Sequence, residues 1–310
     1  KANRLKALVS GSLTKEAFAD ADFVIEAVFE ELSIKKSVFA DLEQHISPEA
    51  ILATNTSSLS ITEIAADLQH PERVVGFHFF NPVAVLPLLE IVRGERTDDP
   101  TLATAFAVSK ALKKSSVLVS DAPAFVVNRL LTRFLGEVTA AVDEGTPIEV
   151  ADRALAPLGL PMSPFILLAL VGPAVALHVA ETMHAVFPDR YHVSPNLRRL
   201  VEAGKPGIYS WDTGSQQLDP DIAELFVLGD RAATEDEVRD RALSALAEEI
   251  GLMLDAGVVA QVQDIDLCML LGAGWPFHLG GVSPYLDRTG ISERMLGHRL
   301  LAPGVASVPA

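Results

Sequence analysis

The fold of this chain is decided by the stretch Val74-Val75-Gly76-Phe77-His78-Phe79-Phe80-Asn81-Pro82 and by Leu88-Leu89-Glu90-Ile91-Val92, which follows closely. Both apolar runs are short and predict β-strands. If the second strand doubles back about a centre near Ala84, His78 lies opposite Glu90, with Cβ atoms about 4.5–5.5 Å apart. A carboxylate at this distance can fix one imidazole nitrogen and leave the other free to take a proton. The pair is therefore a candidate general base, although a purely structural hydrogen bond would give the same pattern.

Composition excludes several classes of protein. The 310 residues are 49% hydrophobic, enough for two or three cores, and the single cysteine, Cys268, rules out a disulfide within the chain. The net charge of -16 argues against nucleic acid as a partner, because phosphate binding needs a clustered basic surface. No metal site is predicted.

Two segments bear on membranes and targeting. The longest apolar run, Phe165 to Ala180, is interrupted by Gly172-Pro173 and is shorter than the roughly 20 residues that span a bilayer. We expect a buried helical segment there and no transmembrane helix. The opening Lys1-Ala2-Asn3-Arg4 has no apolar signal segment, and we expect it to lie inside a longer, cytoplasmic polypeptide.

Residues 1–120 alternate strand and helix signals, the pattern of an α/β domain with a mainly parallel sheet. We predict strands over 23–29, 51–54, 74–79, 88–92 and 116–120, and helices over 33–46, 61–68 and 99–113. Ser60 is the predicted N-cap of the second helix.

After Asp121-Ala122-Pro123 the sequence pattern predicts helices and no further strands. One apolar helix face is predicted by the spacing of Val127, Leu130, Leu131, Phe134 and Val138. Another helix is predicted to begin at the capping box Thr234-Glu235-Asp236-Glu237.

A weak repeat divides this helical region. The repeat has three parts in each copy. The first copy consists of Val142-Asp143-Glu144-Gly145, Asp152 and Gly159-Leu160-Pro161. The second copy consists of Leu254-Asp255-Ala256-Gly257, Asp266 and Gly274-Trp275-Pro276. We predict an α/β domain over 1–120 and two all-α units over 121–230 and 231–310. A linker is expected within 205–233, where Lys205-Pro206-Gly207 and Asp212-Thr213-Gly214 are turn signals.

Four further motifs accompany the His78/Glu90 pair. They are Glu26-Ala27-Val28-Phe29-Glu30 with Lys35, Asn55-Thr56-Ser57-Ser58, the segment Asp121 to Arg129, and the glycine-rich turn Gly272 to Gly281. The first two follow predicted strands, where open α/β sheets place ligands. Each motif has a structural alternative. Glu26, Glu30 and Lys35 could form a solvated charge cluster, and Asn55 to Ser58 could be an ordinary N-cap and turn. Asn128 could simply satisfy backbone groups. Gly272 and Gly274 do not form a dinucleotide motif, because Phe277 replaces the third glycine.

Taken together, the motifs resemble those of the L-3-hydroxyacyl-CoA dehydrogenase family in order and spacing, from about residue 20 onward. The resemblance rests on His78-Phe79-Phe80-Asn81-Pro82, on Asn55-Thr56-Ser57-Ser58, and on Asp121 to Arg129. Two helical units, rather than one, resemble the dehydrogenase region of multifunctional fatty-acid β-oxidation enzymes. The resemblance implies a Rossmann-like domain whose N-terminal part is absent from this chain, followed by two helical units of the dehydrogenase C-terminal type.

The resemblance also implies an activity and a site. The expected reaction is NAD-dependent oxidation of L-3-hydroxyacyl-CoA to 3-ketoacyl-CoA, in a longer chain with enoyl-CoA hydratase activity and a thiolase partner. His78 and Glu90 would be the catalytic pair. Ser57 and Asn128 would flank the substrate oxygen with Asn81 in support, and the nicotinamide side would be lined by Ala27, Glu30, Lys35 and Asn55. The alternative is a non-catalytic module that joins a hydratase to a thiolase.

The sequence departs from the family pattern in several places. Ser163 stands in Pro161-Met162-Ser163-Pro164 where glycine is common, Ala169 stands where an acidic residue is usual, and Lys205 to Tyr209 is a degraded glycine-rich turn. These departures affect what the resemblance implies about the preferred acyl chain length and about local packing, and they do not affect the expected reaction. No G-x-G-x-x-G turn occurs in the 310 residues, so we expect one, with its strands and helix, upstream of Lys1.

Overall fold

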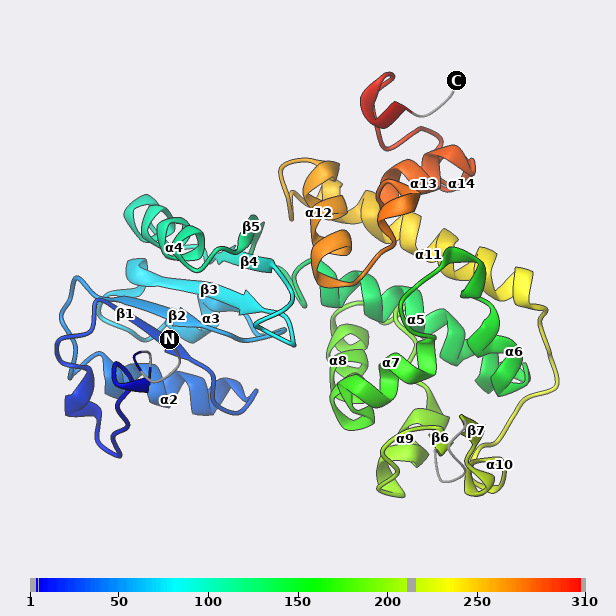
Figure 1. Ribbon diagram of the computed structural model, residues 1–310, viewed down its shortest axis with the longest axis horizontal. Coiled ribbons are helices and arrows are strands. Elements are labelled where there is room, and N and C mark those ends of the chain that lie inside the picture. Colours follow the sequence, from blue (N-terminus) through cyan, green and yellow to red (C-terminus); the bar gives the residue numbers. More distant parts are fainter. Residues whose placement is uncertain (1–3, 5, 211–215, 308–310) are drawn as a thin grey trace.

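A computed structural model describes residue 4, residues 6–210 and residues 216–307. The described chain forms a sheet with covering helices and a larger helical part, which lie side by side in Figure 1. Residues 121–126 connect them. The turn predicted at Asp212-Thr213-Gly214 falls outside the described residues.

A five-stranded sheet forms the first part. Its strands are β1 (Phe23–Glu26), β2 (Ile51–Thr54), β3 (Val74–Phe79), β4 (Leu88–Arg93) and β5 (Ser115–Ser120), in this order across the sheet. Neighbouring strands are parallel except β3 and β4, which are antiparallel. The three central strands are buried along almost their whole length, which explains why they read as apolar runs rather than alternating sequences.

Helices cover both faces of this sheet (Figure 1). On one face, Leu102 and Ala105 of α4 (Asp99–Ala111) pack against Phe77 and other strand residues. On the opposite face lie α2 (Leu32–Leu42) and α3 (Ile61–Ala65), whose Phe39 and Ile64 join the main core.

Several elements end earlier than predicted. β1 ends at Glu26 rather than Phe29, because the Glu26 carboxylate accepts a hydrogen bond from the Val28 amide and the chain turns there. α2 and α3 end at residues 42 and 65 rather than 46 and 68. α4 ends at residue 111 rather than 113, since Lys113 adopts a left-handed φ of 60°. Ser60 caps α3 as predicted, because its side chain accepts from the Glu63 amide.

The helical part is built around α5 (Val127–Glu144) and α11 (Glu235–Asp255), which pack along each other. The other helices are α6 (Ile148–Arg153), α7 (Pro164–Val171), α8 (Pro173–Val186), α9 (Pro195–Glu202), α10 (Pro220–Leu225), α12 (Val262–Gly272), α13 (Val282–Arg288) and α14 (Ile291–Leu296). The predicted capping box at Thr234 opens α11, with both of its hydrogen bonds present.

The two aspartates that recur in the sequence repeat make similar contacts. Asp152 accepts a hydrogen bond from the amide of Phe165 at the start of α7, at 2.9 Å. Asp266 accepts one from the amide of Ser283 at the start of α13, at 2.8 Å. Each aspartate therefore connects a short helix to the one that follows in its own copy.

The two copies contact each other reciprocally. Gly159 and Gly274 have nearly equal left-handed φ angles of 73° and 72°. A Cβ on Gly159 would lie 3.0 Å from the His278 ring in the second copy, and a Cβ on Gly274 would lie 3.1 Å from Pro161 in the first. The turn before α7 therefore packs closely against the turn before α13.

The prediction of one buried helical segment over Phe165 to Ala180 was wrong. The chain bends by 98° at Gly172, between α7 and α8, because Pro173 lacks the amide donor that a continuous helix needs. Leu170 and Val175 are 67% and 55% exposed. Among the described residues, no single helix has the length and apolar character to cross a bilayer, and only this bent pair satisfies both measures together.

Residues 205–233 do not form a free linker. The described part contains a short hairpin of β6 (Tyr209–Ser210) and β7 (Gln217–Leu218), followed by α10. Beyond α10, the Asn196 side chain hydrogen-bonds both the amide and the carbonyl of Val227, and the Gly229 amide donates to Asp143. These contacts hold the segment against the first helical copy.

Candidate active site

His78 and Glu90 lie opposite each other on β3 and β4, in the register that the sequence predicts. Nδ1 of His78 is 2.8 Å from Oε2 of Glu90, and both side chains are buried. The rings of Phe80 and Phe125 pack against the imidazole, with centroids 4.5 and 5.7 Å away. Nδ1 is therefore occupied, and no residue that the structure describes hydrogen-bonds Nε2.

The second carboxylate oxygen of Glu90 is held by the start of α5. Oε1 accepts hydrogen bonds from the amides of Val126 and Val127, at 3.2 and 3.0 Å. Amides in the first turn of a helix lack partners within the helix, and the helix dipole favours a negative group there. Glu90 therefore connects the sheet, the histidine and the helical part.

Sequence reasoning missed these two backbone donors, because an amide leaves no signal in residue type. They are oriented by Ala124 and Phe125, which are fully buried and adopt left-handed φ angles of 58° and 53°. For non-glycine residues such a conformation costs about 1–3 kcal/mol each and is often found at functional sites. The preceding Asp121-Ala122-Pro123 predicted where the helical part begins, but not this turn.

Asn128 and Ser57 meet across the junction between the sheet and α5. The Asn128 amide nitrogen donates to the backbone carbonyl of Ser57 at 3.2 Å, and both residues are half-buried. Asn81 lies beyond the end of β3 and is exposed. The structure brings Asn128 and Ser57 together but does not link Asn81 to either of them.

Glu26 and Lys35 are buried and Glu30 is partly buried, so the alternative of a solvated cluster is wrong. Lys35 is 1% exposed, and its Nζ lies 2.8 Å from Glu26 and 3.4 Å from Glu30. Direct contact of Lys35 with a ligand, which the sequence suggested, does not fit this enclosure. Its single positive charge instead pairs with both carboxylates.

Glu30 organises the loop that carries Ser57. Its Oε1 accepts from the Thr56 hydroxyl at 2.7 Å and from the amides of Ser57 and Ser58 at 2.7 and 3.1 Å. The loop after β2 is therefore fixed from the loop after β1. Lys35 acts on Ser57 only through Glu30.

The segment Asp121 to Arg129 connects several parts of the molecule. The Asp121 carboxylate accepts from the Ser60 hydroxyl and from two amides in the first turn of α3. At the other end, the Arg129 Nε lies 2.6 Å from Oε1 of the fully buried Glu249 on α11. Between these anchors are the amides that hold Glu90 and the side chain of Asn128.

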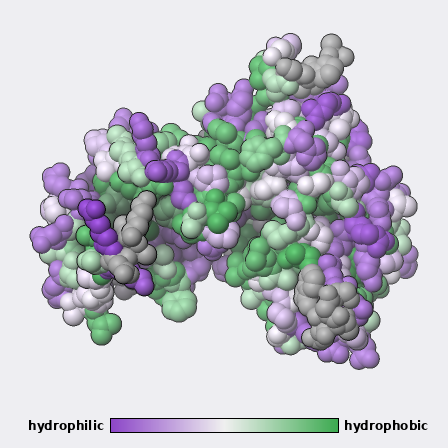
Figure 2. Space-filling view, in the orientation of Figure 1, coloured by the Kyte–Doolittle hydropathy of each residue, from purple (hydrophilic) through white to green (hydrophobic). Residues whose placement is uncertain are grey.

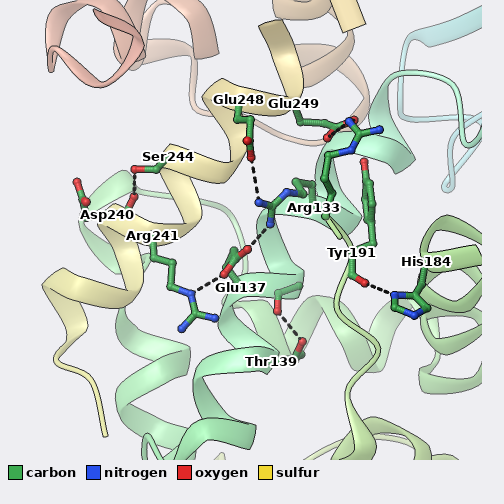
Figure 3. Close-up of polar contacts among 12 residues, drawn as sticks. Arg133, Glu137, Thr139, His184, Tyr191, Asp240, Arg241, Ser244, Glu248 and Glu249 are labelled. Carbon is green, nitrogen blue, oxygen red and sulfur yellow. Dashed lines mark hydrogen bonds and ion pairs between the residues drawn. The ribbon is translucent and has the colours of Figure 1, made fainter. Parts of the chain in front are cut away.

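Arg129 belongs to a larger set of ion pairs between α5 and α11, part of which Figure 3 shows. Arg133 pairs with Glu248 of α11 and, within α5, with Glu137. Arg241 of α11 pairs with Glu137 and Glu144 of α5. These contacts fix the helix that carries Asn128 against the second helical copy.

The second helical copy also packs behind Glu90. A Cβ on Gly272 of α12 would lie only 2.4 Å from the Leu88 side chain on β4, so a larger residue there would require Leu88 to shift. Burial, together with the negative charge of Glu90, raises the pKa of the Cys268 thiol well above its ordinary value. Cys268 therefore remains a neutral core residue.

Comparison of the chain with known protein families gives two matches. Residues 1–122 match 3-hydroxyacyl-CoA dehydrogenase, NAD binding domain, and residues 125–213 match 3-hydroxyacyl-CoA dehydrogenase, C-terminal domain. The chain belongs to the 3-hydroxyacyl-CoA dehydrogenase family. The two matched regions of this dehydrogenase chain meet at the segment that orients the amides for Glu90, and the predicted order of a Rossmann-like sheet followed by a helical domain is confirmed.

Relatives of this dehydrogenase chain include longer proteins and solved structures. The fatty acid oxidation complex subunit alpha of Acinetobacter baumannii (strain SDF) is 34% identical over 306 residues, which are 93% of this chain and 42% of the relative. The chain thus spans about two fifths of the length of the curated relatives that it matches.

Two solved dehydrogenase structures are similar to the chain. The 3-hydroxybutyryl-CoA dehydrogenase of Escherichia coli K12 is 25% identical with a TM-score of 0.72, over 94% of this chain and 81% of the other. The (S)-3-hydroxybutyryl-CoA dehydrogenase PaaH1 of Ralstonia eutropha is 34% identical with a TM-score of 0.61, over 66% of this chain and 74% of the other.

The NAD-binding domain of the family covers the sheet, and the ends of β1 and β2 offer a small residue and an amide side chain for contact with a ligand. Ala27 is exposed after β1 and has only a methyl group to occupy space. Asn55 follows β2, and because its Oδ1 accepts the Phe79 amide at 2.9 Å, its NH₂ group is left to donate. Small residues and an oriented amide at the carboxyl ends of parallel strands suit a planar ring that bears a carboxamide group.

Proposed function

We propose that the protein oxidises the 3-hydroxyl group of L-3-hydroxyacyl-CoA to a ketone with NAD, in fatty-acid β-oxidation. One observation carries the proposal: the buried Glu90 occupies Nδ1 of His78, whereas Nε2 has no partner among the described residues. An imidazole held by a carboxylate, with its other nitrogen free, is suited to remove a hydroxyl proton. Membership of the dehydrogenase family supports the same reaction.

His78 moves the proton in this reaction. Its Nε2 takes the proton from the substrate 3-hydroxyl, and Glu90 stabilises the imidazolium through Nδ1. When bound, NAD supplies the acceptor for the hydride that leaves C3. Loss of one proton and one hydride converts the alcohol to the ketone without a further oxidant. In the reverse direction His78 returns its proton to the developing alkoxide.

Ser57 and Asn128 are proposed to hold the reacting oxygen. They are joined at 3.2 Å across the junction of the sheet and α5, and both keep an exposed fraction that a substrate can reach. Hydrogen bonds to an oxygen that gains negative charge strengthen in the transition state, so they raise the rate. We assign Asn81 a supporting place beside the same oxygen.

The nicotinamide side is proposed to be formed by Ala27, Asn55 and Glu30. Glu30 fixes the loop after β2 through hydrogen bonds from Thr56, Ser57 and Ser58, and Lys35 pairs with it from within the core. Lys35 is thus a positioning residue. This assignment replaces the direct contact that the sequence suggested.

The whole protein is proposed to carry more than this activity. Because the chain spans 42% of its Acinetobacter relative, we propose that the remainder includes an enoyl-CoA hydratase. The name of that relative describes a subunit of a complex, which supports a partner subunit, and we propose a thiolase. A purely assembling role is less well supported, since it gives no reason for the buried His78/Glu90 pair.

The test is NAD-linked turnover by the full-length protein, with L-3-hydroxybutyryl-CoA in one direction and acetoacetyl-CoA in the other. We expect turnover of the L isomer and none of the D isomer. A protein that is folded and binds NADH but turns over neither substrate would establish the assembly alternative. The His78→Ala variant serves as the inactive control.

A further inference from the structure

Arg129 follows Asn128 on α5, and its charge is held by the second helical copy. Its Nε donates to Oε1 of Glu249 on α11, at 2.6 Å. Figure 2 shows exposed apolar surface over α7 and α8, but these two charged side chains are enclosed, since Arg129 is 3% and Glu249 0% exposed. A buried ion pair offsets the loss of hydration only with close geometry and further polar contacts.

The segment after α8 supplies such contacts. Nη1 of Arg190 donates to both carboxylate oxygens of Glu249, at 3.0 and 2.9 Å. The Phe187 ring lies beside both guanidinium groups, with its centroid 4.9 Å from Cζ of Arg129 and 4.0 Å from that of Arg190. An aromatic face attracts a cation, so the ring partly balances the second positive charge beside one carboxylate.

Tyr191 holds the backbone of Arg129. Its hydroxyl donates to the Arg129 carbonyl at 3.3 Å and points toward Glu249 in Figure 3. Burial, together with the negative charge of Glu249, raises the pKa of this hydroxyl, so it remains a donor. Tyr191 also shares a small buried cluster with Ala124, one of the two residues with left-handed φ before α5. Such backbone conformations persist only where surrounding contacts hold them.

All of these contacts act on the turn that serves the candidate site. Its amides hold Glu90, and Asn128 extends from it to the loop after β2. Successive residues of a helix differ by about 100° in direction, so Asn128 can face the sheet while Arg129 faces α11. Glu249 therefore holds the turn from a different side than the one that faces the sheet.

We propose that Glu249 and Tyr191 are positioning residues of the reaction: through Arg129 they set the orientation of Asn128 and of the amides that hold Glu90. The inference rests on the proposed function. It gives the second helical copy a part in the chemistry, from a residue 120 positions further along the chain than Arg129. A shift of about 1 Å in a group that holds the reacting oxygen is expected to lower the rate, while the rest of the site still binds substrate.

The test uses the full-length protein, with L-3-hydroxybutyryl-CoA and NAD, at a temperature where circular dichroism shows the variants to be folded. Glu249→Gln keeps the shape of the side chain but removes its charge, and should lower kcat about tenfold with KM within about twofold. The matched control is Glu248→Gln, which breaks the neighbouring α5–α11 ion pair with Arg133, one turn beyond Arg129. It should leave kcat within about twofold of the wild type.

A double variant separates positioning from a general loss of stability. Asn128→Ala already lacks the group that Glu249 positions, so adding Glu249→Gln should lower kcat by only about threefold more, instead of tenfold. Tyr191→Phe is a milder second variant in case Glu249→Gln does not fold, because it removes only the hydroxyl. It should lower kcat about threefold at unchanged KM, and by less in the Asn128→Ala background.

Three results would overturn the inference and leave the proposed function standing. They are wild-type kcat per folded molecule in Glu249→Gln, a change confined to KM, and a loss that multiplies in full with that of Asn128→Ala. If Glu249→Gln does not fold, the same three results in Tyr191→Phe decide. If the wild type turns over no substrate, the proposed function itself fails.

Discussion

Glu90 binds His78 through one carboxylate oxygen, at 2.8 Å, and the first turn of α5 through the other. The histidine therefore has the same anchor as the helix that carries Asn128. The histidine that we propose transfers the proton and the asparagine that we propose holds the substrate oxygen are fixed relative to each other, although one belongs to the sheet and the other to the helical part.

Replacing His78 with Gln should lower kcat by about 10²–10⁴, the usual contribution of a positioned acid or base, with little change in KM. Glu90→Gln should also lower kcat, because the amide cannot stabilise an imidazolium. Steady-state kinetics of the full-length variants measure both effects. Glu90→Asp, which keeps the charge, should recover part of the loss; wild-type kcat in His78→Gln would refute the assignment.

Asn128→Ala should lower kcat more than it raises KM, by about tenfold or more in kcat, because its hydrogen bond strengthens as the oxygen gains charge. Ser57→Ala should act in the same direction. The comparison of kcat and KM separates this role from simple substrate binding. A change confined to KM would show that the contact is equally strong in the ground state.

Glu249→Gln should destabilise the protein by about 3 kcal/mol, since removal of one partner leaves buried Arg129 without its counter-charge. Thermal or urea unfolding measures the change. The matched control is Glu235→Gln, which breaks the exposed pair with Arg153 and should cost about 0–1 kcal/mol. Equal effects of the two variants would show that the α5–α11 ion pairs do not hold the helices together.

Acid should abolish the contribution of Glu144 to stability. Hydrogen bonds from Arg241 lower the pKa of this carboxyl below its ordinary 4.5, so its stabilisation is complete above that value and is lost as the pH falls through the lowered pKa. The side chain is 34% exposed, so we expect only about 0.5–1 kcal/mol.

The measurement is the unfolding midpoint of wild type and Glu144→Gln as a function of pH. The difference should be constant between about pH 6 and 8 and should disappear well below pH 4.5. The exposed Glu202→Gln serves as a control without such a difference. A wild-type advantage that grows in acid would contradict the assignment.

Much of the sheet could be predicted from the sequence, because its signals are local. The register of β3 and β4 follows from two apolar runs separated by a short connection, so the His78/Glu90 pair was visible without coordinates. The Ser60 cap and the Thr234 capping box also depend on residues within one turn. Lys35 was misjudged, because burial depends on the whole fold and a lysine in a helix gives no sign of it.

The sequence by itself determined which strands pair and that His78 lies opposite Glu90, since strand register and helix caps depend on neighbours a few residues apart. Only the tertiary structure decided how the site is held: the amides of Val126 and Val127 on Glu90, and Arg129 against Glu249 across 120 residues. Backbone donors carry no residue signature, and a contact between distant segments exists only after both have packed on a common core. The small apolar pocket lined by Leu131, Leu160 and Trp275 arises in the same way, because its walls come from segments that meet only in the folded chain.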